Sequence, residues 1–186
     1  MNYACLTNQE FSNYPYQIVP LRFQDIFLIK QWRNDQITIL RQDKFLTDER
    51  QKAYFENTIQ PSFILKQPDQ ILFSYLKNNQ CIGYGGMVHV DWKRKQAEVS
   101  FLVETQRAKD PAVYQADFTT FLKLIKEAAF NDLHFRRLYA ETYDIRPHHI
   151  SILESAGFIE EKRMKDWVTI NNKQIDALIH GCVPNE

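Results

Sequence analysis

The sequence has no excess of charge of either sign. Its 186 residues include 23 basic and 23 acidic side chains, so the formal net charge at pH 7 is zero. Proteins that bind nucleic acid or an anionic membrane surface usually carry a clear basic excess or a basic patch. We therefore expect neither nucleic acid nor a membrane as a partner.

Cysteine is scarce and long apolar runs are missing. The three cysteines, Cys5, Cys81 and Cys182, are odd in number and widely spaced, whereas disulfide frameworks and zinc sites need pairs or clusters. No stretch approaches the length of a membrane span, and residues 1–9 lack the pattern of a signal peptide. These absences predict reduced thiols, no metal and a soluble, cytoplasmic protein.

Aromatic residues are abundant: the chain contains 13 Phe, 9 Tyr and 3 Trp, and 44% of its residues are hydrophobic. A chain of this length and composition can bury a substantial core. Aromatic side chains favour a large core and an apolar pocket. We predict a single domain over residues 1–186, with its core at about 16–183.

The most informative stretch combines a strand with a helix. Residues 97–103 alternate, because the odd-numbered positions are all apolar and Glu98 shares the opposite face with Ser100 and Leu102. Apolar residues at helical spacing then predict a buried stripe on a helix over residues 117–130. A loop that leads into a helix N-terminus is a common seat for phosphate groups, and this suggests a nucleotide-like ligand.

The remaining segments complete a mixed pattern of strands and helices. Strands are predicted at residues 14–21, 71–76, 81–90, 96–103, 137–143, 158–164 and 174–182, and helices at 25–34, 47–60, 117–130 and 147–156. Glycines within the strand at 81–90 indicate a bulge or a close backbone approach. The order predicts an α+β fold with a mixed, mainly antiparallel seven-stranded sheet flanked by about four helices.

Three local sequences, in this order and spacing, carry a resemblance. Residues 81–86 (CIGYGG), 97–102 (AEVSFL) and 152–158 (ILESAGF) resemble the GNAT family of acyl-CoA-dependent N-acetyltransferases, and the match extends over residues 17–183. The chain is similar to members that acetylate ribosomal proteins. Residues 32–34 (WRN) also look like members that acetylate amino groups of nucleotide-linked sugars in polysaccharide synthesis.

The resemblance implies acetyl-CoA as cosubstrate, bound where the fourth and fifth strands diverge. It implies that backbone amides of Leu102 or Val103 hold the thioester carbonyl and that His149 touches the arm of CoA. At the position where the family often carries a tyrosine that protonates the leaving thiolate, this chain has Leu153. The resemblance therefore leaves the source of that proton open.

The family's pyrophosphate loop aligns with residues 113–118, which makes Tyr114, Gln115, Ala116 and Asp117 the implied cofactor contacts. The glycine of the family pattern is replaced by Ala116, and Phe118 stands where a small residue is usual. Glycine lets a backbone approach phosphate closely, so the loop departs from the pattern. Charges upstream, at Arg107 and Lys109, are candidate replacements.

Amide formation needs a group that takes a proton from the amine. Glu98 is the first candidate, since it is the only carboxylate on an otherwise apolar strand, and His89 is the second because imidazole titrates near neutral pH. The alternative for Glu98 is a structural ion pair, with Arg136 or Arg137 as partner. The alternative for His89 is a half-exposed histidine at a strand end.

For the acceptor we consider Trp32, Arg33 and Asn34, with Arg33 pairing a phosphate and Trp32 stacking on a flat ring. The alternative places Trp32 in the core and Arg33 in solvent. No histidine and cysteine pattern predicts a metal site: His148 and His149 are adjacent and diverge on a helix.

The sequence thus predicts direct acetyl transfer to a primary amine of a small acceptor, an amino sugar nucleotide in polysaccharide synthesis being the leading choice. Alternatives are acetylation of a protein N-terminus or an aminoglycoside-like amine, and a GNAT-fold binding module without catalysis, favoured by the altered loop. The oligomeric state is left open, a homodimer included.

Overall fold

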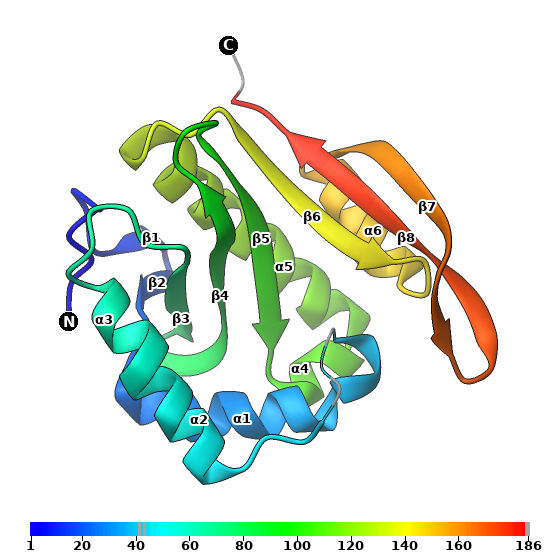
Figure 1. Cartoon of the computed structure of the whole chain (residues 1–186), viewed down its shortest axis with the longest axis horizontal. Coiled ribbons are helices and arrows are strands. Elements are labelled where there is room, and N and C mark those ends of the chain that lie inside the picture. Colours follow the sequence, from blue (N-terminus) through cyan, green and yellow to red (C-terminus); the bar gives the residue numbers. More distant parts are fainter. Residues whose placement is uncertain (41, 43, 185–186) are drawn as a thin grey trace.

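A computed structural model of the chain describes residues 1–40, 42 and 44–184. Figure 1 shows the arrangement of its elements. The strands are β1 (Phe11–Asn13), β2 (Tyr16–Pro20), β3 (Ile71–Lys77), β4 (Gln80–Asp91), β5 (Gln96–Val103), β6 (Arg137–Tyr143), β7 (Ile159–Ile170) and β8 (Lys173–Cys182). The α-helices are α1 (Ile26–Asp35), α2 (Asp48–Tyr54), α3 (Gln60–Ser62), α4 (Thr105–Lys109), α5 (Pro111–Lys126) and α6 (Pro147–Ser155), with π-helical turns at Phe55–Ile59 and Glu127–Asp132.

The strands form one sheet in the order β1-β2-β3-β4-β5-β6-β8-β7. All neighbours are antiparallel except β5 and β6, which are parallel, so the predicted mixed, mainly antiparallel sheet is confirmed. Within the described residues the sheet has eight strands rather than seven. The additional strand, β1, has three residues, too few to produce an alternating pattern.

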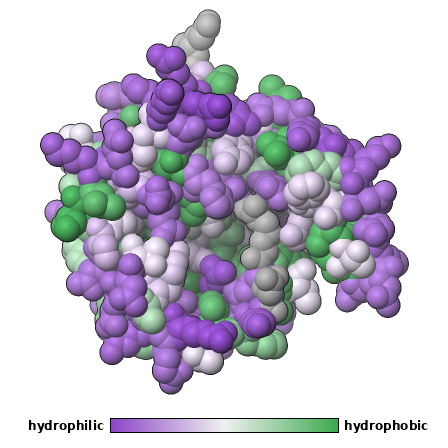
Figure 2. Space-filling view, in the orientation of Figure 1, coloured by the Kyte–Doolittle hydropathy of each residue, from purple (hydrophilic) through white to green (hydrophobic). Residues whose placement is uncertain are grey.

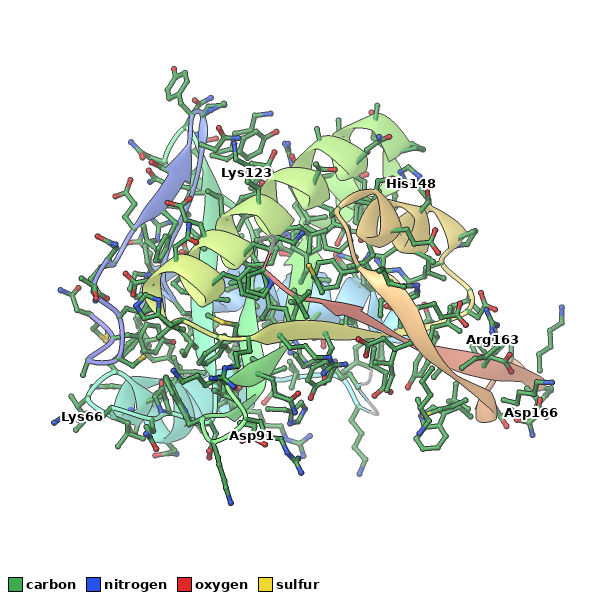
Figure 3. The ribbon with its side chains drawn as sticks, turned by 90° about the horizontal axis from the view of Figure 1, so that it is seen from above. Lys66, Asp91, Lys123, His148, Arg163 and Asp166 are labelled. Carbon is green, nitrogen blue, oxygen red and sulfur yellow. The ribbon has the colours of Figure 1, made fainter. Side chains whose placement is uncertain are left out.

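Helices cover both faces of the sheet. Helices α5 and α6 pack against each other on one face, while α1 and α2 pack against each other on the opposite face (Figures 1 and 3). The odd-numbered face of β5 meets α5, because the Phe101 ring lies 4.6 Å from Phe118 and 4.8 Å from Phe121. The even-numbered positions, Glu98 among them, therefore face the side of α1 and α2.

The glycines of β4 mark the predicted close approach of backbones. A Cβ atom on Gly85 would lie 2.1 Å from the carbonyl oxygen of Ser100 in β5 and 2.7 Å from Cζ of Phe121. Any larger residue would push β4 away from β5 and from α5. Strand β5, which carries Glu98, is thus positioned by direct backbone contact with its neighbour.

The long helix begins earlier than the sequence pattern indicated. Residues 113–118 are not a loop, because α5 starts at Pro111 and includes them in its first two turns. Asp110 is its N-cap: the carboxylate accepts hydrogen bonds from the backbone N–H groups of Ala112 and Val113 at 3.0 and 3.1 Å. Proline suits the first position, since no intrahelical donor is needed there.

The C-terminal strands β7 and β8 form a long hairpin around the predicted turn at Asn171 and Asn172. It extends beyond the helices, and Arg163 and Asp166 lie on its outer part (Figure 3). Hydrophilic residues cover most of the face in Figure 2, with hydrophobic residues in small separate spots. None of the described helices is both long and apolar enough to cross a membrane.

Candidate active site

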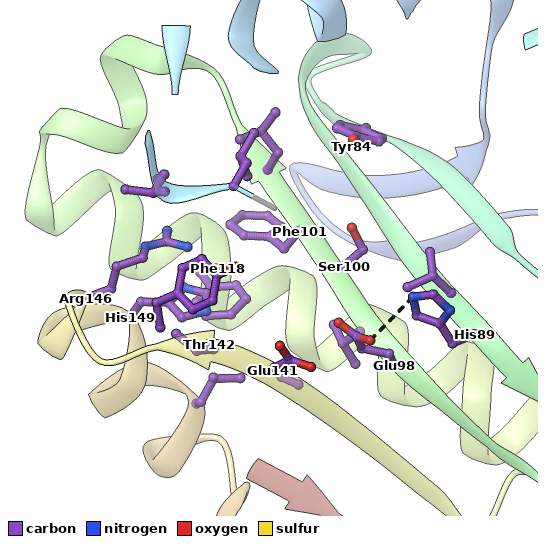
Figure 4. A pocket seen from close by; sticks show the side chains of 18 of the residues that line it. Tyr84, His89, Glu98, Ser100, Phe101, Phe118, Glu141, Thr142, Arg146 and His149 are labelled. Carbon is purple, nitrogen blue, oxygen red and sulfur yellow. Dashed lines mark ion pairs between the residues drawn. The ribbon is translucent and has the colours of Figure 1, made fainter. Parts of the chain in front are cut away.

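The central cavity forms where two parallel strands separate. The ladder between β5 and β6 pairs Gln96, Ala97 and Glu98 with residues 137–139 and ends there in the described part of the chain. Beyond Glu98 the strands diverge around a cavity of about 470 Å³ (Figure 4). This volume lies in the range of small-molecule sites. Strands β5 and β6 are the fourth and fifth strands of the sequence prediction, and they diverge here.

One end of the cavity carries the two predicted catalytic candidates. Glu98 is 4% exposed, and its Oε2 lies 3.8 Å from Nε2 of His89 on β4. The ladder between β4 and β5 is irregular between Val88 and Asp91, and His89 has a φ of 50° there. Such a bulge re-aims a side chain, and here the exposed imidazole is turned toward the buried carboxylate, as Figure 4 shows.

A second carboxylate on the same cavity was missed by sequence reasoning. Glu141 lies two residues after Tyr139, which pairs with Glu98, so both carboxylates belong to the same face of the sheet. Both line the cavity, and Figure 4 shows them on facing strands. The signal was present, because residues 137–143 alternate and put Glu141 opposite the buried Ala140 and Thr142.

Of the three predicted acceptor residues, the structure brings only Arg33 to the cavity. Its guanidinium donates hydrogen bonds to the Tyr84 hydroxyl at 2.5 Å and to Gln42 Oε1 at 2.8 Å. Trp32 is 6% exposed and belongs to the hydrophobic core. The Asn34 side chain holds the following loop, donating to the carbonyl oxygen of Leu46 and accepting from its N–H.

The other end of the cavity is aromatic. Phe101 stacks on Phe118, and Phe118 stacks on His149 with ring centres 4.3 Å apart. His149, the residue that the resemblance implied for the arm of CoA, lines the cavity, and its Nδ1 lies 2.7 Å from the Tyr114 hydroxyl. Arg146, which the sequence reasoning did not consider, lines the cavity and donates to the same hydroxyl at 2.7 Å.

The other implied cofactor contacts lie in different places. Leu102 lines the cavity but pairs with Tyr84 in the ladder between β4 and β5, whereas Val103 lies outside the lining and its carbonyl oxygen accepts a hydrogen bond from Gln36. On α5, Gln115 and Ala116 are exposed and lie outside the cavity lining. Asp117 is fully buried and accepts two hydrogen bonds from the Arg107 guanidinium, at 2.6 and 2.9 Å. Asp117 therefore has a structural role here, and Arg107 is not a free cation for a phosphate.

No cluster of three or more His, Cys, Asp or Glu side chains that could hold a metal ion occurs in residues 1–40, 42 and 44–184. Cys81 lies outside the cavity lining, and burial raises the pKa of its thiol to about 12. The described cavity lining thus offers carboxylates, imidazoles, arginines, hydroxyl groups, an amide and backbone groups.

A family model for the acetyltransferase (GNAT) domain matches residues 18–179. That span is most of the chain and contains β5, β6 and the cavity between them. The chain belongs to the GNAT family. The resemblance predicted from residues 81–86, 97–102 and 152–158 is confirmed, and with it an N-acetyltransferase that uses acetyl-CoA, as the enzymes of this family do.

Solved structures of GNAT enzymes share the fold at low identity. A spermidine N-acetyltransferase from Vibrio cholerae, in complex with CoA and spermine, is 14% identical with a TM-score of 0.77, covering 92% of this chain and 96% of that one. A ribosomal-protein-S5-alanine acetyltransferase from Vibrio fischeri is 15% identical with a TM-score of 0.73, covering 96% and 98%. A search of curated protein sequences found no match.

The GNAT cavity of this chain suits one part of acetyl-CoA better than another. The gap between β5 and β6 has the volume and the open strand edge that a flexible amide-containing arm needs. The N-terminus of α5 does not suit the diphosphate, because Asp110 already occupies two of its N–H donors with a negative charge. At the aromatic end of the cavity, the positively charged side chain in the lining is Arg146.

Proposed function

We propose that this GNAT protein transfers an acetyl group from acetyl-CoA directly to a primary amine of a small acceptor. The observation that carries the proposal is the buried carboxylate of Glu98 beside the exposed His89, at the edge of a cavity between diverging parallel strands. Acetyl-CoA supplies an activated thioester carbonyl. The protein has to supply a neutral amine and a place for the developing negative charge.

Glu98 is the proposed acceptor of the amine proton. Its carboxylate is 4% exposed but contacts the cavity, and His89 at 3.8 Å is 67% exposed and can pass the proton to solvent. Of the two backbone amides that the resemblance implies, the N–H of Val103 is the proposed donor to the thioester carbonyl oxygen, because it faces away from β4. Leu102 pairs with Tyr84, and its N–H belongs to the ladder between β4 and β5. Direct attack fits the chemistry of the lining, because no cysteine is among its described residues.

The leading acceptor is an amino sugar nucleotide. Arg33 supports it, because this guanidinium lines the cavity and is held in place by Tyr84 and Gln42. Planar guanidinium groups bind phosphates through two parallel hydrogen bonds. The phosphates of the acceptor would lie near Arg33 and its amine near Glu98.

A polyamine is the second candidate. Glu98 and Glu141 place two carboxylates on one cavity, and such a pair attracts an acceptor with more than one ammonium group. The similar enzyme from Vibrio cholerae is a spermidine N-acetyltransferase. An acceptor of this kind would use Glu141 as an anchor and Glu98 as the base.

Two measurements test the proposal. The first is calorimetric titration of the purified protein with acetyl-CoA and with CoA, where saturable binding is expected. The second compares kcat/KM for an amino sugar nucleotide and for spermidine in wild type, Arg33→Gln and Glu141→Gln. Arg33→Gln should lower kcat/KM about tenfold or more for the sugar nucleotide alone, and Glu141→Gln should do so for spermidine alone.

The remaining alternatives correspond to other outcomes. Acetylation of peptides or aminoglycosides but of neither small amine would favour those acceptors. Absence of binding by both CoA and acetyl-CoA at millimolar concentration would reject the enzyme proposal and favour a binding module.

We further propose a single domain that acts in the cytoplasm. Light scattering would decide on the homodimer; a similar enzyme from Vibrio cholerae is dodecameric.

A further inference from the structure

His149 lies on the first turn of α6 in a setting that controls its ring. It is 8% exposed, its imidazole stacks on Phe118 at 4.3 Å with an interplanar angle of 11°, and Nδ1 lies 2.7 Å from the Tyr114 hydroxyl. A hydrogen bond between an imidazole and a phenol can run in either direction. Which direction it takes decides which ring nitrogen carries the proton.

Arg146 decides the direction. A guanidinium can only donate, so the 2.7 Å contact between Arg146 Nη2 and Tyr114 Oη is a hydrogen bond accepted by the phenol oxygen. The phenol proton then points to its other neighbour, Nδ1 of His149. A neutral His149 that accepts at Nδ1 carries its proton on Nε2.

The surroundings keep His149 neutral. Burial, and after it the positive charge of Arg146 and the neighbouring His180 and His148, lower the pKa of His149 well below its usual value of 6.5. At neutral pH the ring therefore has one N–H group and one acceptor nitrogen. The stack on Phe118 fixes the plane in which both point.

The Nε2 atom is available to a ligand. The hydrogen bond of the His149 ring in the described structure uses Nδ1, and His149 lines the cavity, so Nε2 is the nitrogen that can face a ligand. Figure 4 shows Arg146, His149 and Phe118 at the same end of the cavity. One directed N–H group is thus offered at the aromatic end of the cavity.

We propose that Arg146 and Tyr114 are positioning residues that fix His149 as the Nε2–H tautomer, so that it donates a hydrogen bond to a carbonyl oxygen of the acyl-CoA. The inference rests on the proposed function for the identity of the ligand. Two carbonyl sources share this chemistry: an amide of the arm, present in CoA and acetyl-CoA, and the thioester, present only in acetyl-CoA.

The tautomer is tested by ¹⁵N–¹H correlation spectra of the labelled protein at pH 7.5, with His149 assigned by its loss in His149→Gln. Wild type should show the Nε2–H tautomer. Tyr114→Phe, which removes only the hydroxyl, should mix in the Nδ1–H form, whereas the exposed Tyr14→Phe should leave the spectrum unchanged. A charged ring or an Nδ1–H ring in wild type, or an unchanged ring in Tyr114→Phe, would overturn the positioning role.

The ligand is tested by calorimetric titration of the same proteins. Tyr114→Phe should weaken binding about two- to tenfold, for both CoA and acetyl-CoA if the arm is the acceptor, and for acetyl-CoA alone if the thioester is. His149→Gln retains an N–H donor and should bind better than His149→Leu. Equal affinity in all variants would overturn the contact. Wild type that binds neither ligand would reject the proposed function, while the spectra still decide the tautomer.

Discussion

Glu98 is a buried carboxylate whose neighbour in the cavity, His89, is open to solvent. A buried base that contacts an exposed imidazole can accept a proton in each turnover and pass it to solvent before the next. The proposed mechanism therefore gives these two residues, named separately from the sequence, one joint role. If Glu98 only formed a structural ion pair and His89 were only a half-exposed histidine at a strand end, replacing either residue would not affect the chemical step.

Glu98→Gln should lower kcat about 100-fold or more, because a positioned general base contributes factors of about this size, and should leave the affinity for acetyl-CoA unchanged. The change keeps the shape of the side chain. Steady-state kinetics and calorimetry on the variant provide the check, with the exposed Glu10→Gln as matched control. A kcat close to wild type would remove Glu98 from the mechanism.

Asp110→Asn tests whether the Asp110 carboxylate at the N-terminus of α5 weakens the binding of phosphate groups there. Asparagine caps a helix as well as aspartate, so folding is retained while one negative charge next to the first N–H groups is lost. We expect CoA to bind about two- to fivefold more tightly at low ionic strength and pantetheine, which has no phosphate, to bind as before. Equal gains for both ligands would contradict an electrostatic cause.

Among the elements, α4 and α5 are joined by a buried ion pair. Arg107 of α4 donates two hydrogen bonds to the fully buried Asp117 of α5, and the Tyr16 hydroxyl of β2 donates a third at 3.0 Å. The pair fixes the segment between β5 and α5 against the sheet. It occupies Arg107, one of the two charges that the sequence had suggested for a phosphate; the other, Lys109, is exposed.

Arg107→Ala should lower the free energy of unfolding by about 3 kcal/mol, because a buried carboxylate loses its counter-charge. Urea denaturation of the variant measures this loss. The exposed Lys109→Ala, on the same helix, should change the stability by less than about 0.5 kcal/mol. Similar losses in both variants would mean that the buried pair contributes little beyond the loss of any side chain of α4.

For the whole molecule, the buried neutral His149 couples stability to pH. The groups that face it are Tyr114 from α5, Arg146 at the N-cap of α6, His148 from α6 and His180 from β8, and burial is the largest cause of its lowered pKa. Since the unfolded chain takes up the proton first, this stability is complete above about pH 6.5 and is lost as the pH falls toward the lower folded-state pKa.

Between about pH 6.5 and 5, wild type should therefore lose up to about 1.4 kcal/mol of unfolding free energy per pH unit from this group. His149→Gln should lose less over the same range. Urea denaturation at pH 7.5, 6.5, 5.5 and 5.0 on both proteins compares the slopes. Parallel slopes would show that acid sensitivity arises elsewhere in the molecule.

Sequence patterns predicted correctly those features that depend on the residues of a single helix or strand. The alternation in residues 97–103 placed Glu98 opposite the apolar face of β5, and Pro147 marked the start of α6. The start of α5 was wrong although Asp110 followed by Pro111 is itself a helix-start signal. The alignment with the family loop took precedence over that local signal. Trp32 and Asn34 were assigned to the acceptor from local resemblance, which carries no information on burial.

The sequence by itself determined the family, through the local sequences at 81–86, 97–102 and 152–158. It also determined the mixed sheet and the residue types of the candidate site, because side-chain alternation and helical periodicity are local properties of the chain. Only the tertiary structure decided which of those residues meet. The parallel ladder of β5 and β6 stops at Glu98, and this opens the cavity that joins Glu98 to Glu141 and Arg33 to His149. Where a ladder stops depends on how residues distant in sequence pack, and no local pattern encodes that.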